Sequence, residues 1–308
     1  MYYPFMRGKR HELAALRKTV QRLNASKVIP IIEPLKENKN DLVRTIKALN
    51  GSNITPMVII NPLVGELVAH DSIDFYSDLV KKQLDFLPCV AFSQANFGAA
   101  YKLATQLSSD LLLFSTYFKD EPTFDVSSIT ASSKVNSVRE SSNTTQRFIG
   151  SLPRLVKIKD SFNAQGRNAD YPPLPSVYSD EHVTYSQVSN AIGFGDYQVV
   201  GEPYSESGGP ARAVAIHITY IDPSQNNVML IKHSVSTTDS GTTTNTGTKF
   251  LEALDELIQF ANSTPALNQT TEGFQAFLDL HARRHYPNLG PVKEYSIMHH
   301  IESISSFL

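Results

Sequence analysis

The sequence predicts an α/β fold of the (β/α)8 TIM-barrel-like class, with an antiparallel β-hairpin insertion and C-terminal helices. In residues 1–150, short apolar runs alternate with amphipathic stretches, and successive runs begin roughly 20–35 residues apart, the length of one strand-helix unit. The runs are continuously apolar, as is typical of parallel strands covered by helices. An open doubly wound sheet fits the same alternation. Neither GxGxxG after the first strand nor GxxxxGKS/T occurs, which favours the barrel.

Six strands and four helices are expected in this first half. The strands are predicted at residues 2–5, 28–32, 57–60, 88–92, 110–114 and 147–150. The helices are predicted at residues 11–23, 40–49, 72–86 and 95–107. Together they predict strands alternating with helices in a parallel sheet.

The alternation ends after residue 150, although we expect residues 1–308 to form a single barrel-like domain. Residues 160–190 are polar and contain a proline cluster, which predicts a long loop over the barrel mouth. Residues 213–235 are predicted to form a β-hairpin with its turn near Ser224, and residues 236–248 a further loop. C-terminal helices are expected within residues 250–308, at 250–260, 274–284 and 295–307.

Composition excludes several classes of protein. Hydrophobic residues make up 41% of the chain and charged residues 19%, which is too apolar for a disordered protein. A single cysteine, Cys89, excludes an internal disulfide framework and a multi-thiolate zinc site, and its apolar surroundings indicate core packing. No apolar run approaches the roughly 20 residues needed to cross a bilayer, and the first residues lack a signal-peptide core. We therefore expect a soluble cytoplasmic protein with no membrane partner.

In a barrel, functional side chains follow the strands, at the carboxyl-terminal face. Arg7 and Lys9 follow the first predicted strand, Glu33 the second and Asn61 the third. The two cations either hold an anion or belong to a solvated turn. Glu33 either binds a metal, accepts a proton or forms an ion pair with Arg7 at the barrel mouth. Since the first two strands are neighbours, we expect Arg7, Lys9 and Glu33 to lie close together, with Arg167 brought to them by the long loop.

The long loop carries the densest group of polar residues. Arg167 suits phosphate recognition, while Asp180 and His182 are candidate acid–base groups or metal ligands. Helix capping by Ser179 is the competing interpretation for Asp180 and its neighbour, and it explains His182 least.

Histidines gather in the second half of the chain. His217 and His233 are predicted to lie nearly diagonal on adjacent antiparallel strands, where they either bind a metal, transfer protons or form structural hydrogen bonds. Of His299 and His300, we expect one to face the core and the other solvent. The chain has no GxSxG, HExxH or EF-hand motif, so the common hydrolase, metalloprotease and calcium signatures are absent.

Several segments together resemble the bacterial proteins related to the phage-type "beta protein" group, or beta family proteins. The matching segments are Tyr2–Leu16, Pro30–Pro34, Arg167–Pro172, Ser179–His182, Gly195–Tyr197, Ala213–Tyr220 and Ser296–Glu302. The resemblance covers nearly the whole chain. It implies a (β/α)-barrel-like protein of bacteria and mobile elements with a role in phage conflict, and it implies no activity or catalytic residues.

Two classes of function remain open. In the first, the protein is an enzyme, such as a phosphate-ester hydrolase, that acts on a nucleotide or nucleic acid with or without a divalent metal. Its substrate would be held by Arg7, Lys9, Asn61 and Arg167, and its acid–base groups or metal ligands would be Glu33, Asp180, His182, His217 and His233. In the second, the protein is a non-catalytic sensor or docking subunit for a partner protein such as a nuclease. No basic helix or finger indicates sequence-specific DNA reading.

Overall fold

The computed structural model describes residues 1–206 and 211–308. Their contacts group into two compact units, which are described separately here. The first unit comprises residues 1–160, 184–197 and 308, and the second comprises residues 161–183 and 198–307. The barrel lies in the first unit, and the hairpin and C-terminal helices lie in the second.

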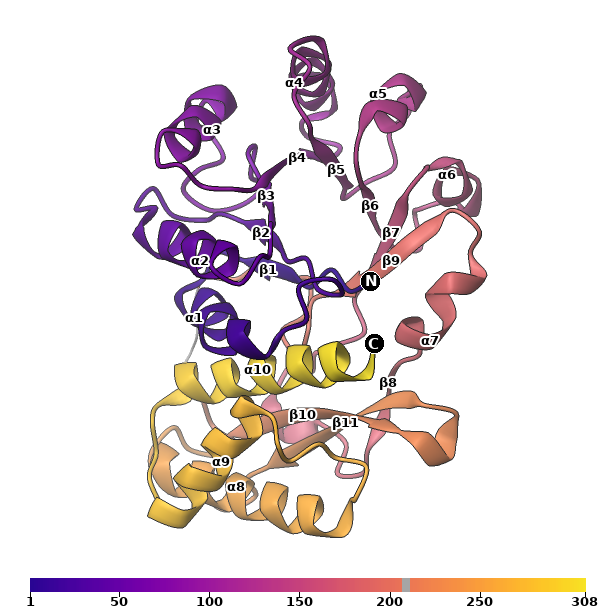
Figure 1. Cartoon of the computed structure of the whole chain (residues 1–308). Coiled ribbons are helices and arrows are strands. Elements are labelled where there is room, and N and C mark those ends of the chain that lie inside the picture. Colours follow the sequence, from indigo (N-terminus) through magenta and orange to yellow (C-terminus); the bar gives the residue numbers. More distant parts are fainter. Residues whose placement is uncertain (207–210) are drawn as a thin grey trace. The chain divides into compact units, whose positions relative to one another are not determined.

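Eight parallel strands form the nearly closed barrel of the first unit, as predicted (Figure 1). In sheet order they are β1 (Phe5–Arg7), β2 (Ile31–Glu33), β3 (Met57–Ile59), β4 (Leu87–Phe92), β5 (Ser115–Phe118), β6 (Asn136–Arg139), β7 (Leu155–Lys159) and β9 (Ala191–Asp196). The intervening helices are α1 (Arg10–Thr19), α2 (Asn40–Asn50), α3 (Ser72–Val80), α4 (Phe97–Ser109), α5 (Ser127–Ser132) and α6 (Gln146–Ser151). Because the sheet order follows the chain order, each helix connects neighbouring parallel strands.

The barrel closes where the first residues of the chain meet β9. Tyr2 forms parallel bridges to both Val28 and Phe194, and the Tyr3 amide donates a hydrogen bond to the Phe194 carbonyl over 2.8 Å. A Cβ atom at Gly195 would lie 2.2 Å from the Tyr3 carbonyl oxygen. Glycine is therefore required in β9 for the backbones to approach this closely.

The barrel interior is filled by side chains. Phe5, Ile31, Met57 and Cys89 belong to this core, and the Tyr117 and Tyr197 hydroxyls share a hydrogen bond of 2.7 Å. Burial raises the pKa of the Cys89 thiol to about 12, so it stays protonated and packs as an apolar group.

Two of the predicted strands are wrong. The apolar run 110–114 precedes β5, and Leu111 is 89% exposed, while residues 147–150 lie in α6. The true sixth strand, β6, contains Asn136 and Ser137, which an apolar pattern does not detect. The Asn136 amide donates to the Thr130 carbonyl over 3.0 Å and its oxygen accepts from the Thr116 hydroxyl over 2.7 Å, which compensates its burial.

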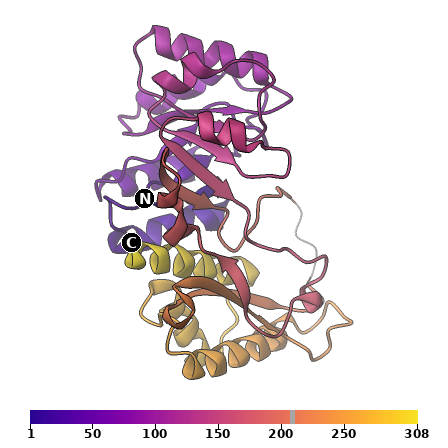
Figure 2. The same cartoon turned by 90° about the vertical axis from the view of Figure 1, so that its right-hand side faces the viewer.

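The second unit contains an antiparallel sheet and three long helices, which confirms the predicted hairpin and C-terminal helices. The sheet order is β10 (Ala215–Asp222), β11 (Val228–Val235) and β8 (Ser176–Ser179), and the helices are α8 (Thr246–Ser263), α9 (Glu272–Arg283) and α10 (Leu289–Phe307). Figure 2 shows this sheet from the side, with α8 beneath it. The predicted loop 160–190 therefore contains a strand, β8, together with the short helices η2 (Asn168–Asp170), α7 (Glu181–Thr184) and η3 (Tyr185–Gln187).

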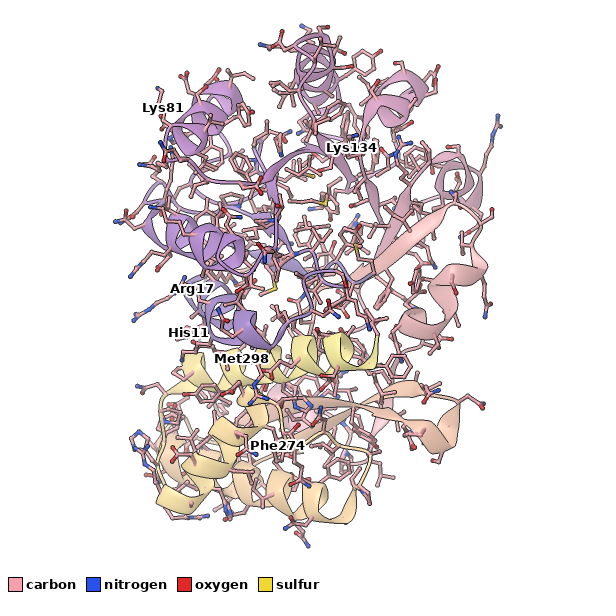
Figure 3. The ribbon with its side chains drawn as sticks, in the orientation of Figure 1. His11, Arg17, Lys81, Lys134, Phe274 and Met298 are labelled. Atoms are coloured by element: carbon pink, nitrogen blue, oxygen red, sulfur yellow. The ribbon has the colours of Figure 1, made fainter. Side chains whose placement is uncertain are left out.

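The core of this unit lies between the sheet and its helices. Ile216 and Ile218 from β10 pack with Leu254 of α8 and with Phe274 of α9, which is labelled in Figure 3. Alternate β10 residues therefore face this core, and His217, between two of them, faces the other side of the sheet. Within residues 1–206 and 211–308, no helix has the length and apolarity needed to span a membrane.

Both His299 and His300 are buried in the second unit, so the prediction that one of them faces solvent is wrong. The Thr271 hydroxyl and His299 Nδ1 lie 2.8 Å apart, and His299 Nε2 lies 2.7 Å from the Thr219 carbonyl oxygen. Since a carbonyl only accepts, Nε2 carries the proton and Nδ1 accepts from Thr271. Burial lowers the pKa of His299 to about 4, which keeps the ring neutral.

Candidate functional site

Arg7 and Glu33 lie side by side at the ends of β1 and β2, as predicted, and form a buried ion pair. The second Glu33 oxygen accepts the Leu63 amide over 2.8 Å, and the Arg7 amide donates to the Glu12 carboxylate over 2.7 Å. These bonds hold the first three strand ends of the barrel together. They agree with the interpretation of Glu33 as a structural ion-pair partner.

Asn61 and Lys9 also lie at strand ends of the barrel. The Asn61 side chain donates to the Ala91 carbonyl and accepts the Ala91 amide, both over 2.8 Å, so its amide group is paired with the backbone of β4. Lys9 is partly exposed and occupies the position before α1. Arg167 belongs to the second unit, and its predicted closeness to Arg7, Lys9 and Glu33 stays a prediction.

Asp180 and His182 flank the start of the short helix α7. The Ser179 hydroxyl oxygen accepts the Glu181 amide over 3.1 Å, which agrees with the capping interpretation, and Asp180 is exposed. His182 is buried, with Nε2 2.7 Å from the Asn227 carbonyl oxygen and its ring edge-on to Phe307. His182 thus connects α7 to the hairpin turn. The predicted catalytic roles of both residues stay predictions.

His217 and His233 lie directly opposite each other on β10 and β11, one step from the predicted diagonal arrangement. Their Nδ1 atoms are 2.8 Å apart, and the ring centroids are 4.9 Å apart. Since the centroid separation exceeds the nitrogen separation by about one ring diameter, the two Nδ1 atoms point at each other. This geometry suits a shared proton, because two ligands of one metal ion point at a third position.

Aromatic side chains of residues 161–183 cover the histidine pair. The Tyr171 ring stacks on His233 with a centroid separation of 4.4 Å, and the Phe162 ring lies edge-on to His217 at 5.0 Å. Burial, reinforced by His233 and then by Lys293, lowers the pKa of His217 to about 3, and burial reinforced by Lys232 lowers the pKa of His233 to about 4. Both rings are therefore neutral near pH 7.

A groove of two adjoining pockets crosses this side of the second unit. The Arg pocket, of about 660 Å³, is lined by Gly166, Arg167, Asn168, Ala169, Ala211, Arg212, Ala213, Ser240, Gly241 and Leu289. The His pocket, of about 430 Å³, is lined by Ala169, Tyr171, Pro173, His233, Val235, Ser236, Thr237, Ser240 and Glu256. Ala169 and Ser240 line both pockets, so the two are continuous.

The Arg pocket carries two exposed guanidinium groups. Arg167 forms a fork with the Asp170 carboxylate, through Nε at 2.9 Å and Nη2 at 2.7 Å. Arg212 is exposed and has no hydrogen bond or ion pair to any residue that the structure describes. The Asn168 side chain donates to the Ala213 carbonyl over 2.7 Å and connects the two segments that bear the arginines.

The charges beside the His pocket are paired. Lys232 Nζ lies 2.5 Å from the Glu256 carboxylate and donates to the Pro173 carbonyl over 2.7 Å, while the second Glu256 oxygen accepts the Val235 amide over 2.8 Å. The pocket therefore carries little net charge, in contrast to the Arg pocket.

The structure thus brings together three predicted site residues, Arg167, His217 and His233, in and beside this groove. Arg212 and Glu256 also line the groove, but they belong to segments without a recognisable motif, so the sequence alone does not indicate them. In the described part of the chain, no cluster of three or more His, Cys, Asp or Glu side chains is arranged to hold a metal ion. No protein-family model matches the chain, and no curated protein matches it in sequence.

Proposed function

We propose that the Arg pocket binds the phosphate group of a nucleotide or nucleic acid. The observation that carries this proposal is that Arg167 and Arg212, from distant segments of the chain, line one pocket. Guanidinium groups match the charge and oxygen geometry of phosphate better than any other side chain.

Two further features support a phosphate site. A Cβ atom at Gly166 or Gly241 would meet no atom within 4 Å, so the backbone at both positions is open to an incoming ligand. Asp170 holds Arg167 through Nε and Nη2, which leaves the Nη1 side of the guanidinium to face a ligand. Because this ion pair is exposed to solvent, water screens it and it competes weakly with a phosphate.

The barrel mouth is the less suitable place for the phosphate. The Arg7 guanidinium is buried against the Glu33 carboxylate, and a cation already neutralised in this way attracts an anion weakly. The phosphate site that we propose therefore keeps Arg167 from the sequence-based set and replaces Arg7 and Lys9 by Arg212.

The proposal includes two possible uses of the bound phosphate. In an enzyme that hydrolyses phosphate esters, Arg167 and Arg212 would hold the reacting phosphate, with or without a divalent metal, and His233 in the adjoining pocket would contact the rest of the substrate. In a sensor or docking subunit, the ligand would bind without turnover and signal to a partner such as a nuclease. The resemblance to the beta family proteins supports a role in phage conflict for either use.

Binding of inorganic pyrophosphate and of a labelled single-stranded oligonucleotide, measured by calorimetry and fluorescence anisotropy, tests the phosphate site. Arg167→Ala and Arg212→Ala should each raise the Kd roughly tenfold, as expected for losing one charge-assisted contact. Arg283→Ala on α9, where Arg283 is exposed and paired with Asp279, is the matched control and should bind as the unmodified protein does. Unchanged binding by the double variant would refute the site.

Turnover is a separate measurement. Release of phosphate from nucleotides and from bis(4-nitrophenyl) phosphate, with and without added Mg²⁺ or Mn²⁺, distinguishes the enzyme from the sensor. Activity that disappears in His233→Ala but persists in Arg283→Ala supports the hydrolase. Tight binding with no release under any of these conditions supports the sensor.

A further inference from the structure

The histidine pair has hydrogen-bonding capacity that the folded chain leaves unused. Each Nδ1 atom is committed to the other ring, and neither Nε2 atom has a hydrogen-bond partner among the described residues. His233 is only 4% exposed and lines the His pocket. A ring nitrogen without a protein partner at the wall of a pocket can donate a hydrogen bond to a ligand or accept one from it.

The position of the shared proton determines whether each Nε2 atom is a hydrogen-bond donor or an acceptor. If His217 donates through Nδ1, His233 accepts there, and its own proton must be on Nε2, which makes Nε2 a donor. If His233 donates, its Nε2 atom carries a lone pair and accepts. A neutral pair therefore presents either a donor or an acceptor at His233 Nε2. The two states interconvert when the shared proton moves between the Nδ1 atoms and, at the same time, one Nε2 atom releases a proton to water while the other Nε2 atom takes one up.

We propose that the His pocket is a nucleobase subsite, in which the hydrogen-bonding edge of the base contacts His233 Nε2 while the nucleotide's phosphate occupies the Arg pocket. This inference rests on the proposed phosphate site and names its substrate class as a nucleotide. His217 is the positioning residue that sets the tautomer of His233.

The lining of the His pocket fits an uncharged, flat, hydrogen-bonding group. Tyr171, Pro173 and Val235 supply apolar surface, and Ser236 and Thr237 also belong to the lining. The Glu256 carboxylate is already paired with Lys232, so no unpaired charge of that residue repels an uncharged base. A pocket that is mostly apolar with a few placed polar groups is typical of small-molecule sites.

The two pockets are also placed for one ligand. They share Ala169 and Ser240, and their volumes of about 660 and 430 Å³ lie in the range of ligand pockets. The contrast in charge matches the two ends of a nucleotide, with cations at one pocket and a neutral histidine at the other. A phosphate alone would use the first pocket and leave His233 without a partner.

Three classes of ligand distinguish the two pockets experimentally. We would measure the Kd of inorganic phosphate, ribose 5-phosphate and the four common nucleoside monophosphates for the full chain. At least one nucleotide should bind roughly tenfold more tightly than ribose 5-phosphate, since base burial adds one hydrogen bond and apolar contact. Equal affinity of all nucleotides and ribose 5-phosphate would overturn the nucleobase subsite while leaving the phosphate site intact.

Variants at the histidine pair test whether His233 is responsible for the tighter binding of the nucleotide. His233→Phe should remove the advantage of the nucleotide without changing the Kd of ribose 5-phosphate, and His233→Gln, which keeps a donor and an acceptor, should restore part of it. His281→Phe, at a partly exposed histidine on α9 that lies beside Asp255, is the control. An increase in Kd that is the same for the nucleotide and for ribose 5-phosphate would overturn the inference. Binding of none of the phosphates by the unmodified protein would instead refute the proposed phosphate site.

A measurement on the unmodified protein guards against variants that fail to fold. Long-range ¹⁵N–¹H spectra of histidine-labelled protein report which ring nitrogen carries the proton. Addition of the preferred nucleotide should shift the Nε2 resonances of His217 and His233, whereas ribose 5-phosphate should leave them in place. Equal shifts with both ligands, or none with the nucleotide, would contradict a base at His233.

Discussion

At the mouth of the barrel, the Arg7 guanidinium and the Glu33 carboxylate are buried against each other, whereas in the groove of the second unit Arg212 is exposed and His233 Nε2 has no partner among the described residues. Both regions contain residue types suited to chemistry. The two regions differ in whether the charges and hydrogen-bonding atoms of those side chains already have partners within the folded chain. A buried ion pair whose charges and hydrogen bonds are all matched holds strands together, whereas a side chain with an unused donor or acceptor is available to a ligand.

The buried histidines of the second unit show the same contrast. His299 uses both ring nitrogens, one on Thr271 and one on the Thr219 carbonyl, while His217 and His233 each use one. All three histidines have a lowered pKa because they are buried. The lowered pKa alone therefore does not separate the three histidines, whereas the number of ring nitrogens that have a hydrogen-bond partner in the described chain does.

The largest effect is expected at the barrel mouth. Glu33→Ala removes the carboxylate opposite a buried guanidinium, and breaking such a pair costs about 3–5 kcal/mol. Urea unfolding should show this loss, and Glu66→Ala, which breaks an exposed pair with Lys36, should change the free energy of unfolding much less. Equal stability of the two variants would mean that the Arg7–Glu33 pair does not hold the barrel together.

A smaller effect is expected at the structural histidine. The Thr271 hydroxyl accepts the Phe274 amide at the start of α9 and donates to His299, so Thr271→Val loses a helix cap and leaves His299 Nδ1 buried without its donor. We expect a loss of about 2 kcal/mol in the free energy of unfolding. His233→Gln should cost clearly less. The reverse order would contradict the division into structural and ligand-binding histidines.

The next largest effect is expected in the pH dependence of the stability of the second unit. An unfolded histidine titrates near 6.5, whereas folded His299 titrates near 4, so below pH 6.5 the unfolded state binds a proton that the folded state does not. Stability therefore falls as pH decreases from 7 to 5.5, by about 1 kcal/mol for His299, and continues to fall toward pH 4. His217 and His233 act in the same direction.

Hydrogen exchange detected by mass spectrometry measures this pH effect for each unit separately. After correction for the intrinsic exchange rate, peptides from β10 and α10 should lose protection between pH 7 and 5.5. His299→Gln should reduce that pH dependence, and His281→Gln should leave it unchanged. A pH dependence that is unaffected by His299→Gln would exclude His299 as its source.

The smallest effect is expected away from both sites, in the loop before β5. Leu111 is exposed and has φ +56°, in the left-handed region that leucine rarely adopts. Leu111→Asn should stabilise the protein by roughly 0.5 kcal/mol, because asparagine tolerates this conformation better. A thermal unfolding midpoint that decreases instead would indicate that the Leu111 side chain makes a contact that stabilises the fold.

Local patterns in the sequence determined much of this protein. The alternation of apolar runs with amphipathic stretches predicts the barrel, and adjacent strand ends place Arg7 beside Glu33. The position of the hairpin turn predicts that His217 and His233 lie near each other on adjacent antiparallel strands, and the observed register places them directly opposite. These features depend on short-range geometry, namely the spacing of apolar residues and the register of neighbouring strands.

Other features depend on residues far apart in the chain and were decided by the tertiary structure. The polar strand β6 is stable because the barrel supplies partners for Asn136, and His300 is buried beside His299 because Thr219 of β10 meets α10. Arg212 joins Arg167 in one pocket only when residues 161–183 pack against the segment after residue 210. Whether a polar side chain is satisfied or remains available to a ligand depends on such distant partners, which local sequence patterns do not specify.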